Sequence, residues 1–196
     1  MRKLIILLSF CPVWCLGQTI KIEAGTTIGS LNYQLNNQTY FNDYAVGYYA
    51  TAGLDFLQKK RINLSSNIGV LKKVGSDMVT LTDALGNEID KKRETRGIDY
   101  LTLNTFADYN FSECRLTPFI FGGARLDYAF NSILINKDRD KNRLTFGATA
   151  GAGVKYRLVE KVMIGFRGGC LINFNNIINT ADRTFSAAAM FGYSLK

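Results

Sequence analysis

The stretch at residues 144–158, "LTFGATAGAGVKYRL", decides the fold class because it alternates between two kinds of residue along its whole length. The even-numbered positions are apolar, namely Leu144, Phe146, Ala148, Ala150, Ala152, Val154 and Tyr156. The odd-numbered positions are small or charged, namely Thr145, Gly147, Thr149, Gly151, Gly153, Lys155 and Arg157. A period of two residues predicts a β-strand. The rest of the chain must show which face of this strand is inside.

Seven further segments alternate in the same way, at residues 20–28, 44–56, 62–70, 101–111, 120–128, 162–172 and 185–195. The weakest is 120–128, because Phe119 and Phe121 fall on the face opposite to its other apolar residues. We therefore expect a β-bulge near Gly122 and Gly123 that switches the register. No stretch shows a convincing helical period, so the sequence predicts an all-β fold.

The connections between these segments are alternately short and long. Three are only a few residues long ("LQKKR", "SECR" and "RLVEK"), and the longest contains "MVTLTDALGNEI", which alternates again around residues 85–87. This order predicts an eight-stranded antiparallel up-and-down transmembrane β-barrel, with short periplasmic turns and long extracellular loops. The third and fourth strands are expected to continue as a hairpin beyond the membrane. The barrel must close, because a strand edge in hydrocarbon cannot leave its amides unpaired.

The face opposite to the apolar one mixes glycines with charged residues of both signs. An eight-stranded barrel has an interior just wide enough to be filled by side chains, so glycines there leave room for a few long charged ones. We predict a lumenal network of ion pairs that plugs the barrel, because a buried charge needs a partner. Its members are Lys21, Glu23, Asp55, Asp108, Arg125, Asp127, Lys155, Arg157 and Arg167. The apolar face then points into lipid, with girdle tyrosines at Tyr44, Tyr109, Tyr128, Tyr156 and Tyr193.

The N-terminal sequence "MRKLIILLSFCPVWCLGQ" indicates a secretory signal peptide. Arg2 and Lys3 precede an apolar run, and small residues stand at Cys15 and Gly17. We expect residues 1–17 to be cleaved and residues 18–196 to form a single barrel domain; a short buried strand or helix is the alternative. Two cysteines then remain, Cys114 and Cys170, and we predict free thiols because their places along the barrel are too far apart for a disulfide.

The composition argues against most catalytic chemistry. The chain contains no histidine, which removes the Ser–His catalytic pair and makes a zinc site improbable. Asp127 beside Arg125, or Asp55 facing Asp108, could in principle act as acid and base, but lumenal ion pairs explain them better. The glycines of "GATAGAG" do not open a helix, as a phosphate-binding loop must. We expect no enzymatic activity, no cofactor and no metal. The formal net charge of +8 suits anionic lipid head groups better than nucleic acid in an exported chain.

Three stretches resemble the PorT-like family of small outer-membrane β-barrel proteins. They are "GIDYLTLNTFADYNF" at residues 97–111, "TPFIFGGARLDY" at 117–128 and "GAGVKYRL" at 151–158. Asn104 stands where the family usually has proline, and the chain ends in Leu195 and Lys196 rather than in an aromatic residue, which leaves the assembly signal to Phe191, Tyr193 and Leu195. The resemblance implies an outer-membrane barrel. The founding member of that family is associated with protein secretion, but the fold alone does not fix a function.

The function expected from the sequence is that of a non-catalytic scaffold or partner-binding subunit in the cell envelope, in contact with outer-membrane lipid. Its partner, for example in a secretion or transport assembly, would be bound by the extracellular loops or the lipid-facing surface. Three alternatives remain, which are a narrow pore for small solutes, a soluble lipocalin-like ligand-binding barrel, and an enzyme that acts on lipid through Asp127.

Overall fold

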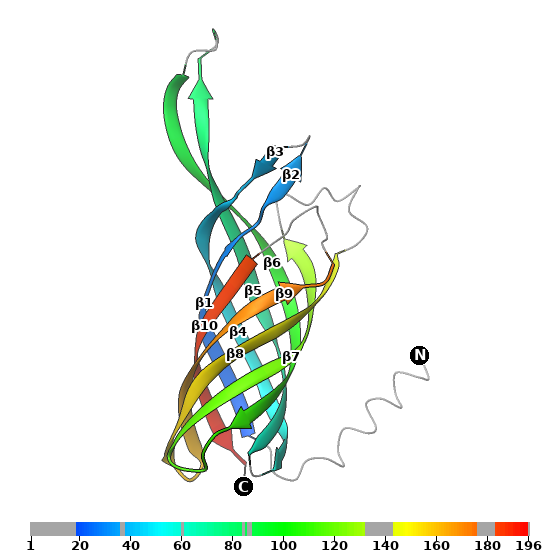
Figure 1. Cartoon of the computed structure of the whole chain (residues 1–196), viewed down its shortest axis with the longest axis vertical. Helices are drawn as coiled ribbons and strands as arrows, with labels where there is room; N and C mark the ends of the chain where they lie inside the picture. Colours follow the sequence, from blue (N-terminus) through cyan, green and yellow to red (C-terminus); the bar gives the residue numbers. More distant parts are fainter. Residues whose placement is uncertain are drawn as a thin grey trace, which may run out of the picture.

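Eight long antiparallel strands close into a barrel in the computed structural model, which describes residues 19–35, 38–59, 61–83, 85, 88–131, 143–175 and 183–195. The strands of the barrel are β1 (Thr19–Ser30), β4 (Asp43–Lys59), β5 (Ile62–Thr82), β6 (Glu88–Asn110), β7 (Leu116–Asn131), β8 (Leu144–Val159), β9 (Val162–Asn173) and β10 (Arg183–Ser194). Two short strands, β2 (Tyr33–Leu35) and β3 (Gln38–Tyr40), pair as a hairpin above the rim (Figure 1). The predicted fold class is confirmed. The predicted signal peptide lies outside the described residues.

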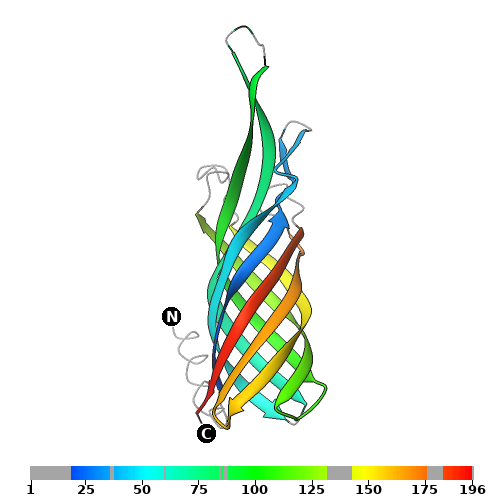
Figure 2. The ribbon, with the colours of Figure 1, turned by 90° about the vertical axis from the view of Figure 1, so that its left-hand side faces the viewer.

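The ring closes where the first barrel strand meets the last. β1 and β10 pair from Thr19↔Ser194 to Ser30↔Arg183 without a register shift, and Figure 2 shows them side by side. Every barrel strand therefore has two neighbours with which its amides can pair inside the membrane. The part of the chain that the structure describes includes no helix that is long and apolar enough to span a membrane.

The connections have the predicted alternation of lengths. Arg61, residues 111–115 and residues 160–161 lie in short connections at the end of the barrel where Thr19 and Ser194 also lie. At the opposite end β5 and β6 stay paired as far as Thr82↔Glu88 and rise as a twisted hairpin well above the other strands (Figures 1 and 2). Short turns mark the periplasmic end in this class of barrel, so the hairpin projects to the outside of the cell.

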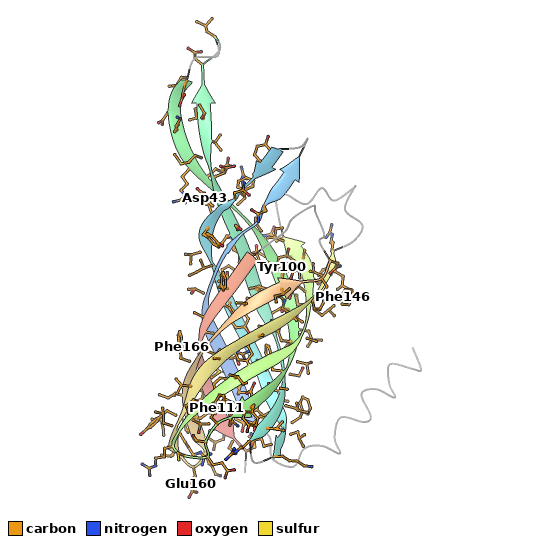
Figure 3. The ribbon with its side chains drawn as sticks, in the orientation of Figure 1. Asp43, Tyr100, Phe111, Phe146, Glu160 and Phe166 are labelled. Atoms are coloured by element: carbon orange, nitrogen blue, oxygen red, sulfur yellow. The ribbon has the colours of Figure 1, made fainter. Side chains whose placement is uncertain are left out.

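The apolar face of the strands is outside and the charged face is inside. Phe146, Phe166 and Phe191 are 52%, 54% and 48% exposed, and Figure 3 shows the first two pointing away from the barrel. Lys155 and Arg167, by contrast, are 7% and 6% exposed. The five girdle tyrosines are also exposed on the outer face. A soluble lipocalin-like barrel needs the reverse arrangement, so that alternative is wrong.

The bulge expected near Gly122 and Gly123 is absent from the described residues, and that prediction was wrong. β7 pairs with β8 without a register shift, which sets Phe119 opposite Gly153 and Phe121 opposite Gly151. Both phenyl rings point into the lumen, where they pack with Phe106 and Met190. A Cβ atom built on Gly151 would lie 2.7 Å from Cζ of Phe121, and one on Gly153 would lie 2.5 Å from Cζ of Phe119. The rings of Phe119 and Phe121 therefore pack against the glycine residues on the lumenal face of β8.

Candidate functional site

The lumen near the periplasmic end holds a chain of alternating charges. Lys21 Nζ lies 2.5 Å from Asp55 Oδ1 and 4.0 Å from Asp108 Oδ2, and Lys155 Nζ donates a hydrogen bond to the same Asp108 oxygen at 2.7 Å. The ammonium group of Lys155 also lies 4.2 Å from the centre of the Phe119 ring. Two ammonium groups face two carboxylates, so this buried group is electrically balanced.

A second ion pair lies further along the lumen. Arg167 Nη1 donates hydrogen bonds to Glu23 Oε1 at 2.9 Å and to Oε2 at 3.3 Å, while Asn67 and Tyr49 donate to the same carboxylate. The guanidinium carbon of Arg167 lies 4.1 Å from the ring centre of Phe106 and 3.8 Å from that of Phe121. Stacking on aromatic faces suits the planar guanidinium. This pair and the rings fill the middle of the barrel.

A third group of charges lies toward the extracellular end. Arg125 Nε lies 2.9 Å from Asp127 Oδ2, and Lys73 Nζ lies 3.7 Å from the same oxygen. Thr102 donates a hydrogen bond to the other carboxylate oxygen at 2.7 Å. Asn173 accepts hydrogen bonds from both Lys73 and Arg125. Asp127 is fully buried among these donors, which leaves no open approach for a lipid substrate to its carboxylate.

An apolar layer lies toward the extracellular end of the lumen. Its members are Leu31, Tyr49, Leu71, Ile98, Tyr100, Ala129, Leu171 and Ala188. The ammonium group of Lys73 lies 4.9 Å from the centre of the Tyr100 ring, so the charged and apolar layers are in contact. Figure 3 shows Tyr100 in the upper half of the barrel.

All of the residues that the sequence predicted for the lumenal network are buried except Arg157, which is exposed. Placing Arg157 in the network was a mistake, because it stands at the periplasmic mouth beside a register shift, where water solvates the guanidinium. The others form three separate groups instead of one continuous network. Lys73 was missed, although it continues the odd-numbered lumenal positions of β5 beyond the segment recognised at residues 62–70.

The periplasmic mouth forms a cavity of about 430 Å³. Buried Asp55 and Lys155 contribute to its lining, together with the exposed charges of Arg115, Arg157 and Glu160. Figure 3 shows Glu160 at the very end of the barrel. Cys114 and Cys170 are both free and exposed. Among the described residues no group of three or more potential ligands is arranged to hold a metal ion.

Residues 17–179 match the model of a protein family described as outer membrane protein beta-barrel domain. The chain belongs to this family. The closed ring of eight strands and the apolar outer face are what such a domain needs in a membrane. The protein is therefore a β-barrel protein of the bacterial outer membrane. None of the proteins with curated descriptions matches the sequence.

Solved structures of small outer-membrane barrels have a similar fold. The N-terminal β-barrel domain of Pseudomonas aeruginosa OprF is 14% identical, with a TM-score of 0.53, and the match covers 90% of this chain and 97% of that one. Neisserial surface protein A (NspA) is 9% identical, with a TM-score of 0.58 and coverages of 90% and 96%. The outer membrane protein OprG of P. aeruginosa is 12% identical, with a TM-score of 0.56 and coverages of 91% and 96%. At these identities the likeness extends to the fold alone.

Proposed function

We propose that this outer-membrane barrel is a non-catalytic scaffold that binds another protein of the cell envelope through the extracellular hairpin, defined as residues 77–82, 85 and 88–94. The observation that carries the proposal is the combination of a filled lumen with a long projecting element. The interior is occupied by three charged groups, an aromatic cluster and an apolar layer, which favours binding of a protein partner on the outside. The PorT-like motifs support a place in a secretion or transport assembly. On this proposal residues 1–17 are removed as a signal peptide and residues 18–196 are the mature domain.

The hairpin has the surface expected of a protein-binding element. Leu85 is 87% exposed, Ile89 67%, Met78 52% and Leu81 45%. Charged residues surround these apolar side chains, including Lys91, Lys92 and Arg93 on β6. Apolar side chains that are exposed among polar ones are typical of protein-protein contact sites.

Site-specific photo-crosslinking in the native membrane tests this proposal. A photoreactive phenylalanine analogue at Leu85 should give a discrete heavier product with one envelope protein, identified by mass spectrometry. The same analogue at Ile120, which is 48% exposed on the lipid-facing surface, is the control, and a product there would assign binding to that surface instead. Recovery of the uncrosslinked protein alone from both variants would contradict the scaffold proposal.

A narrow pore is the competing function, and the cavity at the periplasmic mouth is the observation in its favour. Beyond that mouth a solute meets Lys21, Asp55, Asp108 and Lys155 and then the aromatic rings, all of them buried. Purified protein in a planar bilayer should therefore show no unitary conductance steps. Regular steps in the wild-type recording would favour the pore.

A further inference from the structure

Two arginines are direct neighbours at the periplasmic mouth of the barrel. Arg157 N donates a hydrogen bond of 2.8 Å to the carbonyl of Arg115, and the next pair toward the lumen on the same two strands is Thr117↔Lys155. Both arginines contribute to the lining of the mouth cavity. Like charges that stand opposite each other on neighbouring strands destabilise a sheet. An anion bound between the two guanidinium groups would offset this repulsion.

No carboxylate of the described residues forms an ion pair with either arginine. The exposed charges of the cavity lining are the cations Arg115, Arg157 and Lys161 and the carboxylates Glu113 and Glu160, and Figure 3 shows Glu160 at this end of the barrel. The buried ammonium groups and carboxylates deeper in the lumen balance one another. One positive charge is therefore left over at the mouth.

The buried part of the cavity lining offers both hydrogen-bond donors and an unfilled acceptor. Lys155 is 7% exposed, and its ammonium group, which has three N–H donors, donates one hydrogen bond to Asp108. Asn110 is 8% exposed, and its Oδ1 atom is buried without a hydrogen-bond partner. Buried polar atoms without a partner are rare in folded proteins. The Asn110 oxygen is therefore placed to accept a hydrogen bond from a ligand that carries an N–H group.

The size and the polarity of the cavity suit a short peptide. Its volume of about 430 Å³ lies within the range of about 300–1,000 Å³ that is usual for ligand sites. Uncharged amide and hydroxyl side chains form much of the lining, namely Gln58, Asn63, Ser112 and Thr117. Such groups can both donate hydrogen bonds to peptide carbonyls and accept them from peptide N–H groups. Met163, which pairs with Arg157, adds an apolar contact.

We propose that the periplasmic mouth binds the C-terminal end of a periplasmic polypeptide. The terminal carboxylate lies between Arg115 and Arg157, and a peptide N–H donates a hydrogen bond to Asn110 Oδ1. Guanidinium groups suit the geometry of a carboxylate, and capture of a C-terminal carboxylate is a recurring mode of peptide recognition. One carboxylate matches the single excess charge, whereas a phosphate dianion would be repelled by Glu113 and Glu160. The site opens to the periplasm, so this inference is independent of the extracellular partner proposed above.

Binding of a small peptide to the folded protein in phosphatidylcholine nanodiscs tests the site. The first probe is trifluoroacetyl-trialanine, which has a free C-terminal carboxylate, and the second is the same peptide with a C-terminal amide. Fluorine NMR line widths give the dissociation constants. The test variant is Arg115→Gln with Arg157→Gln, and both side chains are exposed, so this variant should fold. The matched control is Lys91→Gln with Lys92→Gln, which removes the same charge from the extracellular hairpin.

We expect wild type and the control to bind the carboxylate probe about tenfold more tightly than the amide probe, and the test variant to lose this preference. Asn110→Leu keeps both arginines but removes the acceptor, so it should weaken the binding of both probes. N-acetylalanine should displace the carboxylate probe at a lower concentration than inorganic phosphate does, and the reverse order would assign the arginines to a phosphate ligand. The proposal is also overturned if wild type does not distinguish the two probes, if the control loses the preference, or if Asn110→Leu binds like wild type.

Discussion

At the scale of single residues, Arg167 combines a buried ion pair with contacts to two aromatic rings. It neutralises Glu23, which is 0% exposed, and its guanidinium packs against the rings of Phe106 and Phe121. Removing one member of a buried ion pair leaves the other charge without compensation, which is far more costly than removing both. The stability of the barrel should therefore depend on this arginine to an unusual degree.

We predict that Arg167→Ala lowers the free energy of unfolding by about 3–5 kcal/mol, because it leaves the Glu23 carboxylate buried and unpaired. The measurement is the midpoint of urea unfolding in phospholipid vesicles, followed by far-ultraviolet circular dichroism. Arg157→Ala is the matched control, since Arg157 is exposed at the periplasmic mouth and should change stability by no more than about 0.5 kcal/mol. Adding Glu23→Gln to Arg167→Ala should restore part of the loss. Equal midpoints for the two arginine variants would contradict the assignment.

The alternation of the sequence was enough to assign most lumenal charges, but not their partners. The alternation along each strand places Glu23 on β1 and Arg167 on β9 inside the barrel. These strands are separated by β10, however, so the contact between the two residues depends on how far their long side chains reach across the lumen. The alternation also misplaced Arg157, because the alternation predicts the direction of a side chain but not whether that side chain is exposed to water. Lys73 was missed because the alternating segment recognised in the sequence was ended at residue 70, whereas the strand continues beyond it.

At the scale of strands, the glycines of β8 are explained by aromatic residues on β7. Phe119 and Phe121 stand directly opposite Gly153 and Gly151, and their rings occupy the space that larger side chains would fill. The sequence alone suggested a bulge because apolar residues were expected to face lipid. An aromatic residue opposite a glycine satisfies the packing of a narrow lumen equally well, so the register stays regular.

We predict that Gly151→Val destabilises the barrel by about 1–3 kcal/mol, because the added methyl groups overlap the Phe121 ring and the facing backbone of β9. Gly122→Val is the control. A Cβ atom on Gly122 meets nothing within 4 Å, so this variant should stay within about 0.5 kcal/mol of wild type. The comparison uses the same urea titration as above. If both valines were tolerated equally, close packing of the rings on β8 would be refuted.

At the scale of the whole molecule, stability depends on a closed ring of paired strands. The eight barrel strands were predictable because loop lengths and the period of two agree along the entire chain, and closure follows from the absence of water in hydrocarbon. The interruption of the β4–β5 pairing between Tyr44 and Tyr49 was not predictable, since it is a local mismatch in the register of two strands that the sequence pattern treats as continuous. The length of the extracellular hairpin, in contrast, was visible in the alternation around residues 85–87.

A proline placed in the seam of the ring should therefore have a different effect from one placed in the extracellular hairpin. Ala189 lies within β10 and pairs with Ala24 on one side and Phe166 on the other. Ala189→Pro removes an amide from the ladder and leaves its acceptor unpaired in hydrocarbon, at a cost of several kcal/mol. Thr80→Pro lies in the hairpin opposite Lys91, where water can satisfy any group that loses its partner. We expect Thr80→Pro to yield the compact form that migrates faster in unheated gel samples, and Ala189→Pro to yield only the unfolded form after refolding into vesicles. A barrel cannot be left open on one side within the membrane, so partial closure is not an expected outcome. An Ala189→Pro protein that folds as fully as the Thr80→Pro protein would show that the pairing of β1 with β10 is not required.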